Sequence, residues 1–264
     1  MIKVAFFGAA GKMGKMLIAH AVADPDFQVV AALDAPSCPA LGQDAGEHAG
    51  VGAIGVALTS ELPSDVQPDV LIDFSSARAF DAVYSLCTSR NIPLIYCSTG
   101  ISDEQVAKLE EAAKTTLVLR SPSMSPAVNL TMKLAQIAGR ALKDADADVE
   151  ILERHHRYKV DAPSGTALKF GALIAKEMGI DSFRHGREGV VGARPHNEIA
   201  YHAIRTGDDP GQHTILFGML GETLELTVKS SSRDSYASGA LQAAKFLVNS
   251  KPGKLYDMFD VLDL

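Results

Sequence analysis

Residues 4–33 open with Val4-Ala-Phe-Phe-Gly8-Ala-Ala-Gly11-Lys-Met-Gly14 and close with Phe27-Gln-Val-Val-Ala-Ala-Leu33. The first four residues are an apolar run typical of a buried strand, and residues 13–23 have the period of an amphipathic helix. The three glycines let a backbone turn tightly against a phosphate, although ordinary strand-to-helix turns also carry such glycines. Because the loop lies between a strand and a helix in a unit of about thirty residues, the dinucleotide-binding interpretation is favoured.

The rest of the first half repeats this alternation. Strands are expected at residues 69–74, 93–97 and 116–120, and helices at residues 77–89 and after the capping-box pattern Ser102-Asp-Glu-Gln105. Residues 35–55 are rich in Gly, Ala and Pro without a clear period, and we expect them to form a long surface excursion. The nearly continuous apolar strands suit a parallel sheet that is buried on both faces.

The pattern changes near residue 126. Strands that follow one another directly, at residues 198–205, 213–219 and 222–229, predict an open, partly antiparallel sheet. Residues 186–195 are polar and are expected to be mobile. We therefore predict an α/β protein in which residues 1–126 form a Rossmann-like, doubly wound parallel sheet and residues 233–264 pack back on it. Residues 127–232 are expected to form a C-terminal α+β domain with an open mixed sheet for substrate binding and oligomerisation.

Composition narrows the class of protein. The 264 residues carry a formal net charge of -7 and a pI of about 5.6, which disfavours nucleic acid as a partner. The three cysteines are scattered without a CxxC pair, so neither a disulfide framework nor a zinc site is supported. We see no signal-peptide pattern and no apolar run near the roughly 20 residues that cross a membrane. A cytoplasmic protein is expected.

Asp34 ends the second expected strand. A carboxylate at that place can accept hydrogen bonds from an adenosine ribose, which favours NAD, although Asp34 could also be a plain turn residue. Ala35 follows, where an arginine could have held a 2′-phosphate, and Lys12 and Lys15 could partly compensate.

Cys97-Ser-Thr-Gly100 follows the strand expected at residues 93–97. Loops at the carboxyl ends of parallel strands line the ligand crevice, so Ser98 and Thr99 could contact the nicotinamide ribose. A simple connection to the Ser102 helix cap is an equal alternative. Nothing near Cys97 supports an activated thiolate.

Residues 153–168 read Glu-Arg-His-His-Arg-Tyr-Lys-Val-Asp-Ala-Pro-Ser-Gly-Thr-Ala-Leu. Ser164 is a natural helix cap, and the N–H groups after it can bind a carboxylate. A metal site lacks a third ligand at suitable spacing, and the absence of a G-x-S-x-G pattern argues against a serine hydrolase. A solvated basic loop is the plain alternative. The imidazoles of His155 and His156 with the Lys159 ammonium instead predict a site where a small dicarboxylate gains a proton.

This span resembles the signature Glu-x-His-His-x-x-Lys-x-Asp-Ala-Pro-Ser-Gly-Thr-Ala of the 4-hydroxy-tetrahydrodipicolinate (dihydrodipicolinate) reductase family. The resemblance covers nearly the whole chain and includes Gly186-Arg-Glu-Gly189, Gly221-Glu-Thr-Leu-Glu225, Ser232-Arg233 and the ending Tyr256-Asp-Met-Phe-Asp-Val-Leu262. It implies that NADH or NADPH reduces 4-hydroxy-tetrahydrodipicolinate, a cyclic imine dicarboxylate, to tetrahydrodipicolinate in lysine and diaminopimelate biosynthesis. It also implies a homotetramer built through the second domain.

The same resemblance implies residue roles. His155 would donate the proton, and Lys159 would be its catalytic, substrate-binding partner. Substrate binding would fall to His156, Ser164, Gly165 and Thr166. The cofactor, with NADH somewhat favoured by Asp34 and Ala35, would contact Gly8, Ala9, Ala10, Gly11, Lys12, Met13, Asp34, Cys97, Ser98, Thr99, Ser121, Pro122, Ser123 and Met124. No metal is implied.

Some residues depart from the family pattern. Pro122-Ser-Met-Ser125 stands where Ala-Asn-Phe-Ser or Ala-Asn-Met-Ser is frequent, Ala127 where Gly is usual, Cys97-Ser98 where Gly-Thr is usual, and Val228 where His is common. These departures bear on cofactor geometry and preference and leave the proton-donor span intact. Two alternatives stay open: another two-domain amino-acid or imine dehydrogenase, and a regulator that senses a dinucleotide without catalysis.

Overall fold

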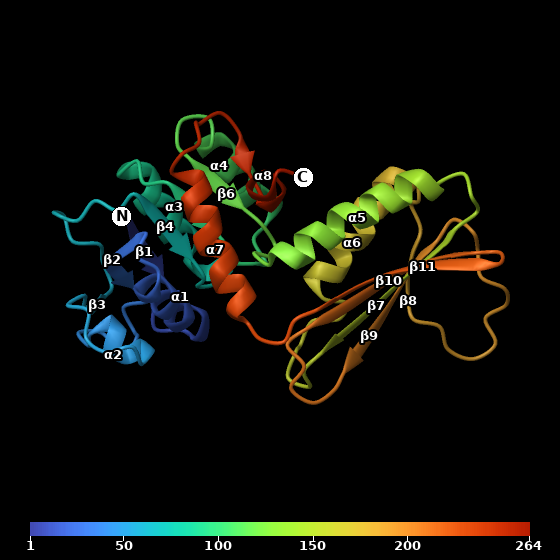
Figure 1. Cartoon of the computed structure of the whole chain (residues 1–264), viewed down its shortest axis with the longest axis horizontal. Coiled ribbons are helices and arrows are strands. Elements are labelled where there is room, and N and C mark those ends of the chain that lie inside the picture. The colour runs from blue at the N-terminus through green and yellow to red at the C-terminus, as the bar shows by residue number, and fades with distance from the viewer. The chain divides into compact units, whose positions relative to one another are not determined.

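A computed structural model describes residues 1–264. The chain divides into two compact units, one made of Met1–Ser125 with Asp234–Asp263 and the other of Pro126–Arg233 with Leu264. Each unit contains one sheet, and Figure 1 labels most of the strands of both. None of the helices combines the length and the hydropathy that a membrane-spanning segment requires.

The first unit is built on a seven-stranded parallel sheet with the order β12-β6-β5-β4-β1-β2-β3. Its strands are β1 (Ile2–Phe7), β2 (Phe27–Leu33), β3 (Leu58–Thr59), β4 (Val70–Asp73), β5 (Leu94–Tyr96), β6 (Val118–Arg120) and β12 (Leu255–Tyr256). Because β1 lies between β2 and β4, the chain order reverses there, and ligands bind at the carboxyl ends of strands beside such a reversal. The Rossmann-like, doubly wound sheet is confirmed.

Helices cover both faces of this sheet. They are α1 (Lys12–Ala23), α2 (Ala45–Ala49), the 3-10 helix η1 (Ala77–Ala79), α3 (Phe80–Ser89), α4 (Asp103–Ala112), α7 (Asp234–Leu247) and α8 (Met258–Leu262). Val4 and Phe6 of β1 pack in the cluster that contains Leu17 of α1, whereas Ala5 packs in the cluster that contains Phe80 of α3. Successive side chains of a strand point to opposite faces, so this strand is buried on both sides.

Residues 35–55, expected to form a long surface excursion, contain helix α2 and a turn built around Asp44. The Asp44 carboxylate caps α2 by accepting hydrogen bonds from the N–H groups of Gly46 and Glu47. It also accepts from the N–H groups of Ile54 and Gly55, at 3.1 and 2.7 Å. One carboxylate therefore gathers the turn, and these four donors hold its pKa below the usual value although burial opposes them.

The second unit contains a five-stranded mixed sheet with the order β11-β10-β7-β9-β8, as expected for an open mixed sheet. Its elements are α5 (Pro126–Leu142), β7 (Asp148–His155), α6 (Gly165–Met178), β8 (Phe183–His185), β9 (Ile199–Arg205), β10 (Gln212–Met219) and β11 (Glu222–Lys229). Strand β10 runs antiparallel to β7 and β11, whereas β9 runs parallel to β7 and β8. Figure 1 shows α5 and α6 together over one face of this sheet.

Alternation along β7 places two sets of charged groups on opposite faces. Glu153 and His155 share the buried face with Val149 and Ile151. Glu150 lies on the other face, where Arg187 and Arg194 each approach it to within 2.9 Å. Through these ion pairs residues 186–195, which the sequence predicts to be mobile, are attached to the sheet at Arg187 and Arg194.

Candidate active site

The glycine loop after β1 has the geometry of a phosphate cradle. Gly8 has a φ of +80°, and a Cβ on Gly14 would lie 2.3 Å from the Gly8 carbonyl oxygen, so both positions require glycine. Gly11 caps α1 without a side-chain hydrogen bond. The N–H groups of Lys12 and Met13 in the first turn have no partner within the helix, and they fit a pyrophosphate.

Asp34 holds this loop as well as facing the expected ribose site. Its Oδ2 accepts a hydrogen bond from Ala10 N at 2.8 Å, and its Oδ1 accepts one from Ala35 N at 2.8 Å. A carboxylate offers about four lone-pair sites, so two acceptor positions remain for ribose hydroxyls. The carboxylate whose negative charge is predicted to select the cofactor therefore also holds the phosphate loop, through its hydrogen bond with Ala10 N.

A buried carboxylate that the sequence analysis did not single out lies at the end of β4. Asp73 has no exposed surface and accepts hydrogen bonds from Ser98 Oγ at 2.6 Å and from the hydroxyl and N–H of Ser75. Burial raises its pKa, and these hydrogen bonds oppose the rise. Ser98 therefore donates inward and keeps a lone pair for a ligand, whereas Thr99 is exposed. The Cys97 side chain is buried in the core, and burial raises its pKa well above the usual value.

Residues 121–124 follow β6 at the same edge of the sheet. The Ser121 hydroxyl donates to the Ser123 carbonyl at 2.8 Å, and Met124 packs into the core. Pro122 is half-buried, whereas the other three residues of the loop are buried. Since all these strands are parallel, the loops after β1, β2, β4, β5 and β6 lie along one edge. The structure thus brings every predicted cofactor residue to the carboxyl edge of one sheet.

In the second unit, Glu153 lies at the centre of a cluster of charged side chains that includes His155 and Arg205. Its carboxylate is buried and lies 2.5 Å from His155 Nδ1, while Arg205 donates two N–H groups to it at 2.7 and 2.8 Å. Burial alone would raise the pKa of Glu153, but the hydrogen bonds from His155 and Arg205 outweigh it and hold the pKa at about 2. An ionised carboxylate can only accept, so Nδ1 of His155 carries a hydrogen and Nε2 is the remaining functional atom. A Cβ at Gly211 would lie 3.0 Å from Nε2.

Lys159 lies on the loop that follows β7. Its ammonium pairs with Asp161 at 2.7 Å and is about one-fifth exposed. Burial would raise the pKa of Asp161, but the hydrogen bond from Lys159 lowers it below the usual value. The Nδ1 atom of His156 is buried and has no hydrogen-bond partner in the protein. An ammonium that can exchange its partner suits the binding of an anion.

Ser164 begins α6 and is almost completely buried. Its hydroxyl oxygen accepts from Ala167 N at 3.1 Å and lies 3.0 Å from Nε2 of His213, while its N–H donates to Glu153 at 3.1 Å. The hydroxyl predicted to bind substrate is therefore used within the protein. Gly165 is exposed, Thr166 is half-buried, and their first-turn N–H groups have no partner within the helix.

Sequence reasoning gave no role to Glu153, Arg205 or His213. The alternation of side chains along a strand predicts that Glu153, two residues before His155, lies on the same face of β7, and this signal could have identified it. Arg205 and His213 come from neighbouring strands, with Arg205 opposite His155 and His213 opposite Glu153. Only the strand register brings them to the cluster, and one sequence does not give that register.

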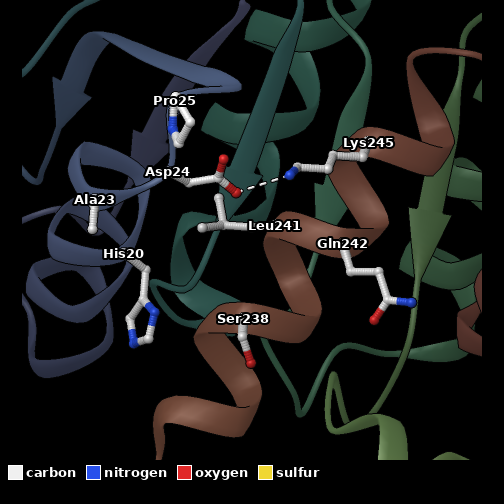
Figure 2. Close-up of a pocket in the computed structure, with 8 residues that line it drawn as sticks. All are labelled: His20, Ala23, Asp24, Pro25, Ser238, Leu241, Gln242 and Lys245. Carbon is white, nitrogen blue, oxygen red and sulfur yellow. Dashed lines mark ion pairs between the residues drawn. The ribbon is translucent and has the colours of Figure 1, made fainter.

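Two hollows lie outside the predicted site. One of about 490 Å³ separates the end of α1 from α7, and Figure 2 shows Asp24 and Lys245 facing each other across it. Its charges are already satisfied, because Lys245 pairs with Asp24 and Asp26 and His20 pairs with Asp234. The other, of about 500 Å³, is lined by Arg154, Lys229 and the segment 206–210, among others. Neither contains a predicted catalytic, substrate-binding or cofactor-binding residue.

Comparison with known proteins covers both units. The family model for the N-terminus of dihydrodipicolinate reductase matches residues 2–124, and the model for its C-terminus matches residues 127–262. The 4-hydroxy-tetrahydrodipicolinate reductase of Rhodopirellula baltica is 52% identical over 270 residues, which cover 100% of this chain and 96% of that protein. The same enzyme of Alkalilimnicola ehrlichii is 43% identical and covers 99% of both chains.

Solved structures agree with this relationship. The dipicolinate-bound dihydrodipicolinate reductase of a Paenisporosarcina species superposes with a TM-score of 0.76 at 27% identity, covering 98% of both chains. An amine dehydrogenase from Mycobacterium smegmatis, at 14% identity and a TM-score of 0.69, shares the fold alone. The two family models together match nearly the whole chain, and the chain belongs to the dihydrodipicolinate reductase family.

Proposed function

We propose that the chain uses NADH or NADPH to reduce 4-hydroxy-tetrahydrodipicolinate to tetrahydrodipicolinate, in lysine and diaminopimelate biosynthesis, with His155 as the proton donor. Membership in the family supports the reaction and does not favour an amine dehydrogenase or a non-catalytic regulator. The observation that carries the assignment of His155 is the 2.5 Å contact between its Nδ1 and the buried Glu153 carboxylate.

The hydrogen bond to Glu153 keeps the His155 ring in one orientation before and after the ring releases a proton. A bound nicotinamide would supply the hydride for the reduction, and the 4-hydroxyl group of the substrate leaves as water, on the enzyme or before binding. Glu153 accepts a hydrogen bond from Nδ1 whether the ring is charged or neutral. The imidazolium form therefore releases its proton from Nε2, and the neutral ring keeps the same hydrogen bond. Because Gly211 has no side chain, nothing at that position covers Nε2.

The two carboxylates of the substrate need two separate anion-binding groups. The Lys159 ammonium can exchange Asp161 for one carboxylate. The N–H groups of Gly165 and Thr166 at the start of α6 can bind the other, where the helix dipole adds to their attraction. We assign His156, whose ring is half-buried beside His155 in the chain, to the substrate side as well. We assign Ser164 to holding this turn, since its hydroxyl is already engaged.

The edge of the first sheet fits a nicotinamide dinucleotide. The loop Gly8, Ala9, Ala10, Gly11, Lys12 and Met13 would hold the pyrophosphate. Asp34 would accept from the adenosine ribose, and its charge beside the 2′ position favours NADH. Ser98, Thr99 and residues 121–124 would lie toward the nicotinamide, where Asp73 fixes the direction of the Ser98 hydroxyl.

We further propose a homotetramer in a cytoplasmic setting. The open mixed sheet of the second unit supports the first, because most side chains of its edge strand β11 are exposed. Three free cysteines without a disulfide are typical of a reducing compartment. Sedimentation of the purified chain measures the assembly directly.

The experiment that tests the proposal is oxidation of NADH and NADPH in the presence of synthase-generated 4-hydroxy-tetrahydrodipicolinate. We expect turnover by the wild type, and a kcat lowered by about two or more orders of magnitude in His155→Ala, the range for a lost general acid. Cofactor binding should stay unchanged in that variant. An unaltered kcat would remove His155 from its role, and turnover of simple amino acids instead would favour the dehydrogenase alternative.

A further inference from the structure

His213 is a buried imidazole to which the proposed reaction gives no part. It lies on β10 directly opposite Glu153 of β7 and is 5% exposed. Its ring packs edge-on against His155 at 5.3 Å and also lies 5.8 Å from Phe170. Burial, and then the proximity of His155, lowers the pKa of His213 to about 4. It is therefore neutral at physiological pH and has one nitrogen that accepts hydrogen bonds.

The hydrogen-bond directions at Ser164 identify that nitrogen. The Ser164 oxygen accepts the N–H of Ala167, as a helix cap does, and its own hydrogen is free to point elsewhere. His213 Nε2 lies 3.0 Å away, so the hydroxyl donates to it. Ser164 is thus held from two strands, through its N–H by Glu153 of β7 and through its hydroxyl by His213 of β10.

We propose that His213 is a positioning residue for substrate binding: as a neutral acceptor it fixes Ser164, and through Ser164 it fixes the first turn of α6 in the orientation that grips a substrate carboxylate. The inference rests on the proposed function of Gly165 and Thr166 as that grip. It separates His213 from the proton transfer itself, because the acceptor atom of its ring is occupied by Ser164 and donates nothing to the substrate.

Two variants of similar polarity test this role. In His213→Gln the amide oxygen reaches the place of Nε2, whereas in His213→Asn it is one methylene too short. The probe is dipicolinate, titrated into the protein saturated with NADH, together with steady-state kinetics. We expect His213→Asn to weaken dipicolinate binding and raise the substrate KM by about tenfold, the effect of one lost hydrogen bond, with a smaller change in kcat. His213→Gln should stay within about threefold of wild type.

Further variants separate positioning from packing. The single variant Ser164→Ala should raise KM. Adding His213→Asn to that variant should raise KM little further, because both substitutions remove the same hydrogen bond. Phe170→Leu, which alters the packing around His213 without touching the bond, should lower Tm and leave KM unchanged. Equal effects of Gln and Asn, additive effects with Ser164→Ala, or a KM rise in Phe170→Leu would overturn the role of His213. Failure of the wild type itself to bind dipicolinate would instead overturn the proposed substrate site.

Discussion

Glu153 and His155 lie two residues apart on the same face of β7, with the buried carboxylate 2.5 Å from the imidazole Nδ1. Arg205 holds the other side of the same carboxylate with two N–H groups. The relationship resembles the way a buried aspartate orients the histidine of a serine protease. It gives the His155 imidazole, the proposed proton donor, a fixed ring plane and a defined tautomer.

Glu153→Gln should therefore lower kcat by about a hundredfold while leaving the affinity for NADH unchanged. A neutral amide cannot accept from both His155 and Arg205 as the carboxylate does, so the ring loses its fixed orientation. Glu150→Gln is the matched control, since Glu150 belongs to the same strand but points to the opposite face. It also loses pairs with Arg187, Arg194 and His202. Equal losses of kcat in the two variants would contradict the orienting role of Glu153.

The pH dependence of stability should carry the signature of Glu153. Its folded-state pKa of about 2 lies below the usual 4.5, so its stabilising contribution is present above about pH 4.5 and is lost as the pH falls toward 2. The difference corresponds to at most about 3 kcal/mol. Urea unfolding at several pH values should show a constant gap between wild type and Glu153→Gln above pH 4.5 that narrows below it. A gap that widens in acid would show the opposite linkage.

Lys159→Ala should lower kcat and raise the substrate KM together. The ammonium would bind a carboxylate in the ground state and stabilise developing charge in the transition state, so we expect about a tenfold change in KM and about a hundredfold loss of kcat. Asp161→Asn is the control, because it frees Lys159 from its partner without removing the charge that binds substrate. If the cofactor KM alone moved, Lys159 would belong to a different site.

Gly165 offers a test of the backbone grip that keeps the helix intact. It occupies the first position of α6, where proline is well tolerated, and Ser164 before it has a ψ of 151°, which suits a residue preceding proline. Gly165→Pro removes a single N–H and should weaken dipicolinate binding about tenfold. Gly165→Ala keeps the N–H and adds a Cβ into open space, so it should bind normally. Loss of binding in both variants would point to crowding and away from the N–H group.

The fold could be predicted wherever the apolar pattern is long. Strand β2 has the bounds that its sequence indicates, because apolar side chains run along almost its whole length. Strands β3 and β8 were not predicted, since two or three residues such as Leu58 and Thr59 contain no period of their own. They are strands because β2 and β9 pair with them, and pairing is a tertiary property.

The site could be predicted where its residues are contiguous in the chain. The glycine loop and the span from His155 to Thr166 each gather several functional groups in one short segment. Arg205, His213 and Asp73 could not be assigned in this way, because their roles depend on burial beside a partner that is distant in sequence. A histidine on an alternating strand is usually a half-exposed surface residue, and only its burial next to Ser164 gives His213 a specific hydrogen bond.

Asp34 should affect both cofactor choice and cofactor affinity, and two substitutions separate these effects. Asp34→Asn keeps an oxygen that can accept from Ala10 N but removes the charge, so NADPH should improve relative to NADH by about tenfold with little loss of overall affinity. Asp34→Ala also removes the acceptor of the hydrogen bond from Ala10 N. The phosphate loop is then no longer held by residue 34, and we expect the Kd of both cofactors to rise. Fluorescence titration of each variant with NADH and NADPH measures both quantities. If Asp34→Asn left the ratio of the NADH and NADPH affinities unchanged, the carboxylate would serve only to hold the phosphate loop, and Lys12 or Lys15 would govern the choice between the two cofactors.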